Sequence, residues 1–192
     1  MSIWYPRMPA KRLRVTVRIT LLGILAAGTY GALHDQISYS ISPEYFTKLK
    51  FRQFARADFG WPPRVFASEV GFLGTWWVGL LAGWVLGRAG LAELTETTTR
   101  NYVARAVAIV ISVGASAGVI GALIGVAVSR GDLSDWAEWQ RLLTLRDVPA
   151  FVIVAYLHAA GYLGGLLGLA FAIVYVRRAL SRQRRINATI RS

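Results

Sequence analysis

The stretch A-V-A-I-V-I-S-V-G-A-S-A-G-V-I-G-A-L-I-G-V-A-V, Ala106 to Val128, contains no charged side chain. A helix needs about 20 predominantly apolar residues to cross the hydrocarbon core of a bilayer, so this stretch predicts a transmembrane helix. Three further segments have the same character, at about 15–34, 69–88 and 149–176. Together with the quoted stretch, which we extend to 105–129, they predict an all-α polytopic membrane protein built as a four-helix transmembrane bundle.

The composition favours one membrane domain over the whole chain, residues 1–192, rather than a soluble core. Hydrophobic residues make up 55% of the sequence and charged residues 17%, whereas a soluble domain carries about a quarter charged residues. The charged residues lie in clusters between the apolar segments. Cysteine is absent, which excludes disulfides, thiolate metal sites and cysteine nucleophiles.

The charge distribution predicts the topology. The two segments 35–68 and 130–148, together with Glu69 at the edge of the first, carry eight acidic and eight basic residues, so the whole net charge of +12 lies on the other side of the four spans. An excess of Lys and Arg marks the cytoplasmic side, so we expect cytoplasmic tails at 1–14 and 177–192 and outer loops at 35–68 and 130–148. Fourteen of the 22 basic residues lie on that side, against Glu93 and Glu96: Arg7, Lys11, Arg12, Arg14, Arg18, Arg88, Arg100, Arg105, Arg177, Arg178, Arg182, Arg184, Arg185 and Arg191.

The basic tails account for the basic pI without nucleic acid. Tails of this kind set topology and attract anionic lipid head groups at the cytoplasmic face, so the expected partner is the lipid bilayer. The N-terminal basic and apolar regions also resemble a signal peptide. The apolar run is long for that role and has no clear small-x-small cleavage site before His34, so we expect the first span to stay uncleaved.

Each predicted span carries small residues at intervals of about four. Helices in a membrane associate where small residues let their backbones approach, so these positions predict a tight bundle. The same pattern is compatible with a homo-oligomer or a second membrane protein as partner. The expected packing residues are Gly31, Gly83, Gly118, Gly121, Gly161 and Gly165.

The first outer loop is expected to contain a short interfacial helix. Ile37 to Ile41 alternates apolar and polar residues, which favours an extended strand-like segment. Ser42-Pro43-Glu44 then has the residue types of a helix start: an N-cap serine, a proline at the first position and an acid near the positive helix end. The helix is expected to end near Phe54 and is too polar to span the bilayer.

The two histidines of the chain are the leading candidates for chemistry, because ionisable groups inside a membrane are costly. Counting 1.5 Å per residue from the nearest basic residue places His34 about 24 Å from the charged side and Glu69 and His158 about 28 Å from it. Asp35 is adjacent to His34, and Glu44 can reach inward from the short helix. We therefore expect these five residues to form one polar cluster near the outer face.

Histidine and carboxylate together suit a divalent metal or a proton relay. The alternative is that both histidines hold helices together through hydrogen bonds. The sequence has no H-E-x-x-H pair, and nothing marks Ser38 or Ser40 as a nucleophile, so no catalytic residue is assigned. We therefore expect a non-enzymatic membrane component with a polar cluster near the outer face; the alternative is an embedded site that binds a metal, a proton or a small ligand for transport or catalysis.

The stretch H-D-Q-I-S-Y-S-I-S-P-E-Y-F, His34 to Phe46, resembles a pattern in small bacterial integral membrane proteins of unassigned function. The resemblance extends to H-A-A-G-Y-L-G-G, His158 to Gly165. It implies a multi-pass protein of the bacterial cytoplasmic (inner) membrane. It supplies no activity, cofactor or catalytic residue.

Overall fold

The structure is a computed structural model that describes residues 9–88 and 96–191. Four long helices dominate it, and no strand occurs within those ranges, so the predicted all-α four-helix bundle is confirmed. The long helices are α1 (Ala10–Ile41), α3 (Pro63–Arg88), α4 (Glu96–Ser129) and α6 (Val148–Arg191). The short elements are η1 (Tyr45–Lys50), α2 (Phe51–Gln53), η2 (Ala55–Ala57), η4 (Ser134–Trp136) and α5 (Ala137–Leu143).

All four long helices are long and apolar enough to cross a membrane, so the chain is a multi-pass membrane protein. The 26 residues of α3 rise about 39 Å, enough for a hydrocarbon core of about 30 Å. Large apolar side chains such as Leu33, Leu123 and Leu163 are about 60% exposed or more, as expected for surfaces that face lipid. The candidate spans are Ala10–Ile41, Pro63–Arg88, Asn101–Ser129 and Val148–Arg182.

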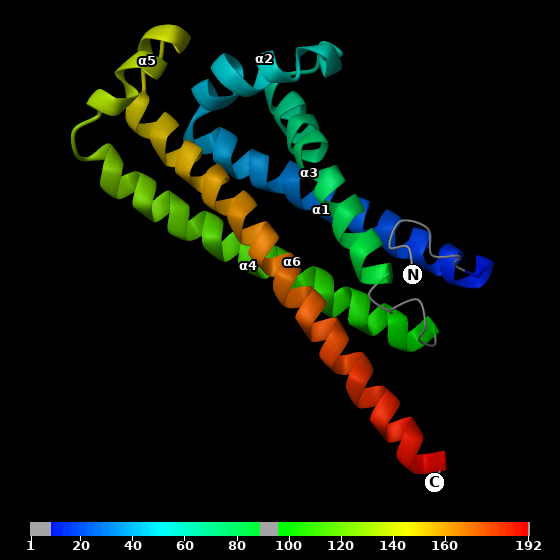
Figure 1. Cartoon of the computed structure of the whole chain (residues 1–192). Helices are drawn as coiled ribbons and strands as arrows, with labels where there is room; N and C mark the ends of the chain where they lie inside the picture. Colours follow the sequence, from blue (N-terminus) through cyan, green and yellow to red (C-terminus); the bar gives the residue numbers. More distant parts are fainter. Residues whose placement is uncertain (1–8, 89–95, 192) are drawn as a thin grey trace.

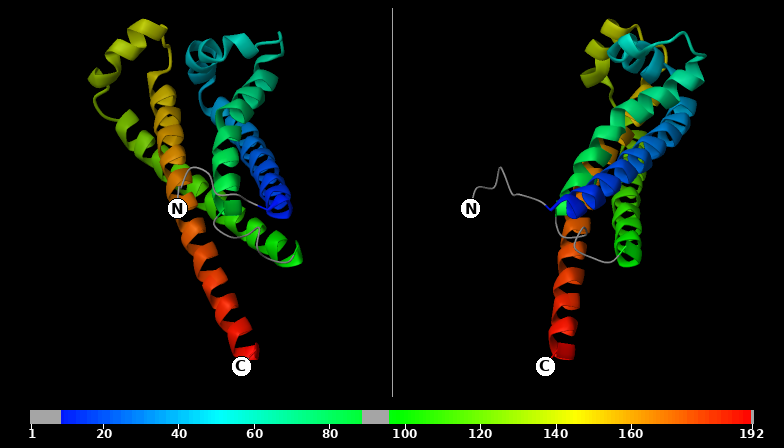
Figure 2. Two further views of the ribbon diagram at one scale, coloured as in Figure 1. Left: turned by 45° about the vertical axis from the view of Figure 1, so that its right-hand side comes forward. Right: turned by 90° about the vertical axis from the view of Figure 1, so that its right-hand side faces the viewer.

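The bundle is made of two helix pairs. α1 packs along α3 and α4 packs along α6, whereas the two pairs touch each other sparingly. Figure 1 shows the pairs as blue with teal and green with orange, and Figure 2 shows in both views that the short helices of the two pairs lie at the same end of the bundle. The start of α1 and the end of α6 lie at the opposite end of the bundle.

Two apolar clusters join the pairs, one at each end of the bundle. Near the short helices, Phe46 of η1 and Ala67 of α3 pack with Phe151 of α6. At the other end, Ile19 of α1 packs with buried residues of the other three long helices, among them Ala172 of α6. Between the clusters the pairs separate, which leaves room for the cavity described below.

Glycines allow the helices within each pair to approach closely. A Cβ atom on Gly31 would overlap the backbone of Gly71 in α3, and one on Gly83 would lie 2.6 Å from Thr20 Cα. In the other pair, a Cβ on Gly121 would lie 2.5 Å from Ala160 Cβ. Because lipid is as apolar as the side chains, burial of apolar groups does not drive helices together in a membrane. Close backbone approach at small residues stabilises each pair instead.

Two of the expected packing glycines, Gly161 and Gly165, have open space on the side where a Cβ atom would lie. A Cβ built on Gly161 or Gly165 meets nothing within 4 Å, so neither position is closed by a facing helix. Their neighbours Gly164 and Gly168 make the tight contacts of α6 with α4 instead, and Gly118 meets α6 at ordinary van der Waals distance. The backbone of Gly161 and Gly165 still lies 3.6–3.9 Å from the Cβ positions built on Gly114 and Gly118 of α4, so both glycines border that helix contact and leave open space on their own Cβ side.

The expected extended segment from Ile37 to Ile41 is also corrected, since α1 stays helical through Ile41. The Ser38 and Ser40 hydroxyls donate to the carbonyls of His34 and Gln36, one turn back, at 3.1 and 2.9 Å. The helical period, rather than alternation, then places Asp35 and Ser38 on one buried face. Tertiary packing has overridden the local pattern.

The short helix after α1 begins where the sequence indicates. Ser42 breaks α1 with extended backbone before Pro43, as residues before proline prefer, and its Oγ accepts the Tyr45 N–H at 3.3 Å. The sequence did not indicate that Tyr45–Lys50 would be π-helical. Such turns are rare and frequently occur at functional sites.

Candidate functional site

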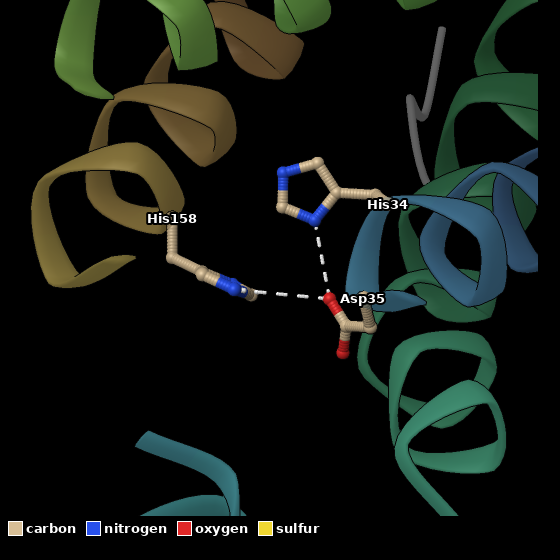
Figure 3. A group of neighbouring side chains, drawn as sticks. All are labelled: His34, Asp35 and His158. Carbon is tan, nitrogen blue, oxygen red and sulfur yellow. Dashed lines mark hydrogen bonds and ion pairs between the residues drawn. The ribbon is translucent and has the colours of Figure 1, made fainter. Parts of the chain in front are cut away.

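Three side chains from two helices meet at the end of the bundle that carries the short helices. His34 Nδ1 lies 3.1 Å from Asp35 Oδ1, and His158 Nε2 of α6 lies 3.8 Å from the same oxygen. The imidazole centroids are 4.9 Å apart and their planes are nearly perpendicular. Figure 3 shows both rings directed at the carboxylate between them.

The site is buried between α1 and α6. The Asp35 and His158 side chains are 7% and 6% exposed, and His34 is 19% exposed. His158 lies one turn after Val154, which is fully buried, so the helical period turns both residues toward α1. The depth estimated by residue counting thus brought the two histidines to the level at which they meet.

Ser38 is the fourth polar group of the site. It lies one turn after His34 and is fully buried. Because its hydroxyl donates to the His34 carbonyl at 3.1 Å, its oxygen is available to accept from His158 Nε2, which lies 3.2 Å away. Sequence analysis considered Ser38 only as a nucleophile. Its spacing of three from Asp35 and four from His34 would have indicated that it shares their face.

The π-helical turn covers His158. The Tyr45 ring stacks on the His158 imidazole with centroids 4.9 Å apart, and the Phe46 ring meets it edge-on at 6.1 Å. Both aromatic residues are buried. The i→i+5 hydrogen bonding of the π-turn places Lys50 beside Tyr45, with Nζ 5.8 Å from the ring centroid.

Burial perturbs the two titratable groups of this turn. It raises the pKa of the Tyr45 phenol, since the charged form is the one that loses water, and nearby negative groups add to the rise. Burial lowers the pKa of the Lys50 ammonium, and Asp35 partly opposes that change. Within the described ranges, no carboxylate oxygen lies within ion-pair distance of Lys50 Nζ.

Two of the five expected residues stay outside this group. Glu44 Oε2 accepts the backbone N–H groups of Arg146 and Asp147 at 2.9 and 2.8 Å, so it holds the turn just before α6, where Asp147 Oδ1 caps the helix by accepting the Ala150 N–H. Glu69 on α3 contributes no ligand atom to the group. Its Oε2 is buried without a hydrogen-bond partner in the part of the chain that the structure describes.

The reason for the difference is geometric. Glu69 belongs to α3, and its carboxylate is not among the ligand atoms from α1 and α6 that come within 4.8 Å of one another. Glu44 follows the turn at Ser42, which directs its side chain along the surface toward the start of α6 rather than inward. Depth along a helix was predictable, whereas direction around it was not.

The three remaining residues can hold a metal ion. One potential ligand atom from each of His34, Asp35 and His158 lies within 4.8 Å of the others. In a tetrahedral zinc site with bonds of about 2.0–2.2 Å, ligand atoms lie about 3.3–3.6 Å apart. The distances of 3.1 and 3.8 Å bracket that value, so small side-chain rotations suffice.

A cavity of about 370 Å³ adjoins the site and extends between the two helix pairs. Its lining comes from all four long helices, with Lys50 and Phe54 at the end near the short helices. Sequence analysis did not predict it. The signal was present in the glycines at 161 and 165, which were interpreted as packing positions.

Comparison with protein-family models, with curated proteins and with solved structures finds no match to this chain.

Proposed function

We propose that this chain is a multi-pass protein of the bacterial cytoplasmic membrane that binds a divalent transition-metal ion, with zinc favoured. The ligands are His34, Asp35 and His158. The observation that carries the proposal is the convergence of three ligand atoms within 4.8 Å, on two helices, in a largely buried setting. The role is one of binding, and no catalytic residue is assigned.

The electrostatics support a cation at this place. An isolated carboxylate in a low-dielectric interior is strongly disfavoured unless it is paired or coordinates a metal. Neutral imidazoles and one carboxylate suit zinc, and three protein ligands leave a fourth position open. The cavity lies on that open side, since His34, Asp35 and His158 all contribute to its lining.

The charge distribution supports the orientation included in the proposal. The +12 excess lies at the end of the bundle opposite to the metal ligands, with the start of α1 and the end of α6. With that end cytoplasmic, the site lies near the outer face, the short helices lie at the outer head groups, and the basic tails meet anionic lipids.

Metal analysis of the purified protein tests the proposal. Protein reconstituted with zinc and freed of excess ion by desalting is expected to retain about one zinc per chain. The variants His158→Gln and Asp35→Asn are each expected to lose at least tenfold in zinc affinity. Asp58→Asn, an exposed acid whose Oδ1 accepts the Gly60 N–H, is the matched control.

The result separates metal binding from helix-to-helix hydrogen bonding. If the histidines only hold helices together, the wild type retains no zinc and His158→Gln lowers thermal stability alone. Zinc retention that is equal in the wild type and in both variants would also contradict the proposal.

A further inference from the structure

The cavity between the helix pairs has the properties of a site for a lipid-like ligand. Its volume of about 370 Å³ lies at the lower end of the range for small-molecule pockets. Most of its lining is apolar or glycine, from Ala27, Val70 and Val78 on one pair to Val110 and Leu166 on the other. A water-soluble polar ligand would lose its hydration there without replacement.

The room in the cavity is created by missing side chains. Gly161 and Gly165 line it, and a Cβ on either meets nothing within 4 Å. Gly74 lies across from them on α3, where a Cβ would meet only the Tyr162 hydroxyl at 3.3 Å. On the Cβ side of these glycines the space is therefore not filled by a facing helix backbone, in contrast to Gly31 and Gly71.

The cavity opens sideways at the depth of the membrane. Three residues of its lining keep large exposed fractions: Trp77 at 45%, Tyr162 at 41% and Leu166 at 60%. These residues belong to membrane-spanning helices of both pairs. A ligand therefore enters from the hydrocarbon of the bilayer, which selects molecules that carry an apolar chain.

One end of the cavity is polar, and its lining includes the basic side chain of Lys50. Lys50 lines that end beside His34, Asp35 and His158. The Asp35 carboxylate is engaged by the two imidazoles, whereas the Lys50 ammonium has Tyr45 as its ring contact and no ion pair among the described residues. A head group at this end is favoured if it is anionic.

We infer that the cavity binds a single-chain anionic amphiphile, a long-chain fatty acid, with its carboxylate at Lys50 and its chain between the helix pairs. The volume admits one chain rather than a two-chain phospholipid. The inference rests on the cavity and on Lys50, and it does not depend on the metal ion. A zinc ion at His34, Asp35 and His158 would add positive charge at the same end.

Binding of radiolabelled palmitate to the full chain in phosphatidylcholine nanodiscs tests the inference. Saturable binding of about one palmitate per chain is expected. The double variant Gly161→Leu/Gly165→Leu places two side chains in the cavity from Cβ positions that have nothing within 4 Å, and it is expected to bind at least tenfold more weakly. Ala170→Leu, which adds a leucine on an exposed face of α6 outside the cavity lining, is expected to bind as the wild type does.

Head-group recognition is tested at the two lysines of the π-turn. Lys50→Gln is expected to weaken palmitate at least fivefold while leaving the methyl ester of palmitate unchanged. Lys48→Gln is the control, because Lys48 Nζ lies 3.4 Å from Thr144 Oγ1 and not in the cavity lining. Equal affinity of all proteins for palmitate and its ester would overturn the inference.

A second measurement keeps the inference testable if the double variant does not fold. A photoactivatable fatty acid is expected to label wild-type peptides that contain residues 71–78 and 161–166, and labelling confined to the outer lipid-facing surface would overturn it. Palmitate binding is also measured in EDTA. Binding that persists there while zinc retention fails would contradict the metal proposal alone, and zinc retention without palmitate binding would contradict this inference alone.

Discussion

Ser38 and Ser40 show how much one position in a helix changes the role of a side chain. Both hydroxyls donate to a carbonyl one turn back, but only the Ser38 oxygen lies 3.2 Å from His158 Nε2. Ser38→Ala would leave that buried nitrogen without its nearest partner, which costs about 1–3 kcal/mol. We expect a lowered thermal midpoint of the metal-free protein, measured on purified protein in detergent.

Ser40→Ala is the matched control for that change. Ser40 is exposed and its oxygen meets the Arg64 guanidinium at 3.2 Å, an exposed contact that contributes little. We expect a change below about 0.5 kcal/mol. Equal effects of the two alanine variants would mean that the hydroxyls matter only for the helix backbone and that the His158 contact contributes nothing.

Lys50 gives a pH dependence whose sign follows from its burial. Because burial lowers its pKa below that of an exposed lysine, the unfolded state binds more protons between the folded and the unfolded pKa, so stability rises with pH across this window. Lys50→Met removes the buried charge. We expect its thermal midpoint to exceed that of the wild type at pH 7 and the difference to shrink toward pH 10.

The measurement is a series of thermal scans on lipid-free protein, with Lys48→Met as the control on the same turn. We compare how the thermal midpoint changes between pH 7 and pH 10 in the wild type and in Lys50→Met. If the two midpoints change in parallel, burial of the Lys50 ammonium does not destabilise the protein.

For single residues, the sequence indicated the position of a side chain along the helix axis but not the direction in which it points around that axis. Residue counting brought His34 and His158 to one level, because the rise per residue of a helix is constant. It also counted Glu69 into the cluster, although the Glu69 carboxylate contributes no ligand atom to it. Tyr45 and Lys50 were not predicted as site residues, because a π-turn changes which residues share a face and leaves no simple periodic signal.

At the scale of elements, Glu44 links two segments that are far apart in the sequence. Its carboxylate accepts the N–H groups of Arg146 and Asp147 at the start of α6, where a negative charge also complements the helix dipole. Glu44→Ala is expected to destabilise the protein by about 1–2 kcal/mol. Glu44→Gln keeps an acceptor and is expected to lose less than half of that.

Thermal unfolding in detergent measures both variants, and Glu138→Ala on the exposed α5 is the control. Since Glu44 precedes Tyr45, which stacks on His158, the alanine variant is also expected to weaken zinc binding. Loss of stability in Glu44→Gln as large as in Glu44→Ala would mean that the negative charge, rather than the hydrogen bonds, holds the two segments together.

Glycine-to-alanine substitutions distinguish a glycine at a helix contact from a glycine that lines the cavity. Gly71→Ala would press a methyl group onto the Gly31 backbone, and forcing such a contact apart costs about 1–3 kcal/mol. Gly165→Ala meets open space and gains up to about 1 kcal/mol of helix propensity. We expect a lower thermal midpoint for the first and an equal or higher one for the second. A similar fall in both would contradict the assignment of Gly165 to a cavity.

The sequence predicted the four long helices because apolar length is a direct requirement of the bilayer. It did not predict which helix pairs with which, since all four carry small residues at similar spacing. Gly31 and Gly165 look alike in the sequence, yet one touches a facing backbone and the other lines the cavity. Which of the two roles a glycine has depends on how the two helix pairs are placed relative to each other. That placement is a property of the packed bundle and not of one helix.

At the scale of the whole molecule, the two helix pairs are joined at both ends and separated between them. The apolar cluster around Phe46 and Phe151 lies at one end and the cluster around Ile19 and Ala172 at the other. The metal ligands lie near the first cluster, and the cavity continues from them toward the second. A ligand in the cavity therefore contacts both pairs and is expected to stabilise their association.

The proposed orientation has a direct test, because the chain contains no cysteine. Single cysteines can be placed at Ala55, in η2, and at Ser181, in the basic part of α6, both exposed. The positive-inside rule places the +12 excess in the cytoplasm. In whole bacterial cells, a membrane-impermeant maleimide is then expected to label Ala55→Cys and to label Ser181→Cys only after the membrane is permeabilised. Labelling of Ser181→Cys in intact cells, with Ala55→Cys protected, would invert the orientation and move the metal site and the polar end of the cavity to the cytoplasmic side.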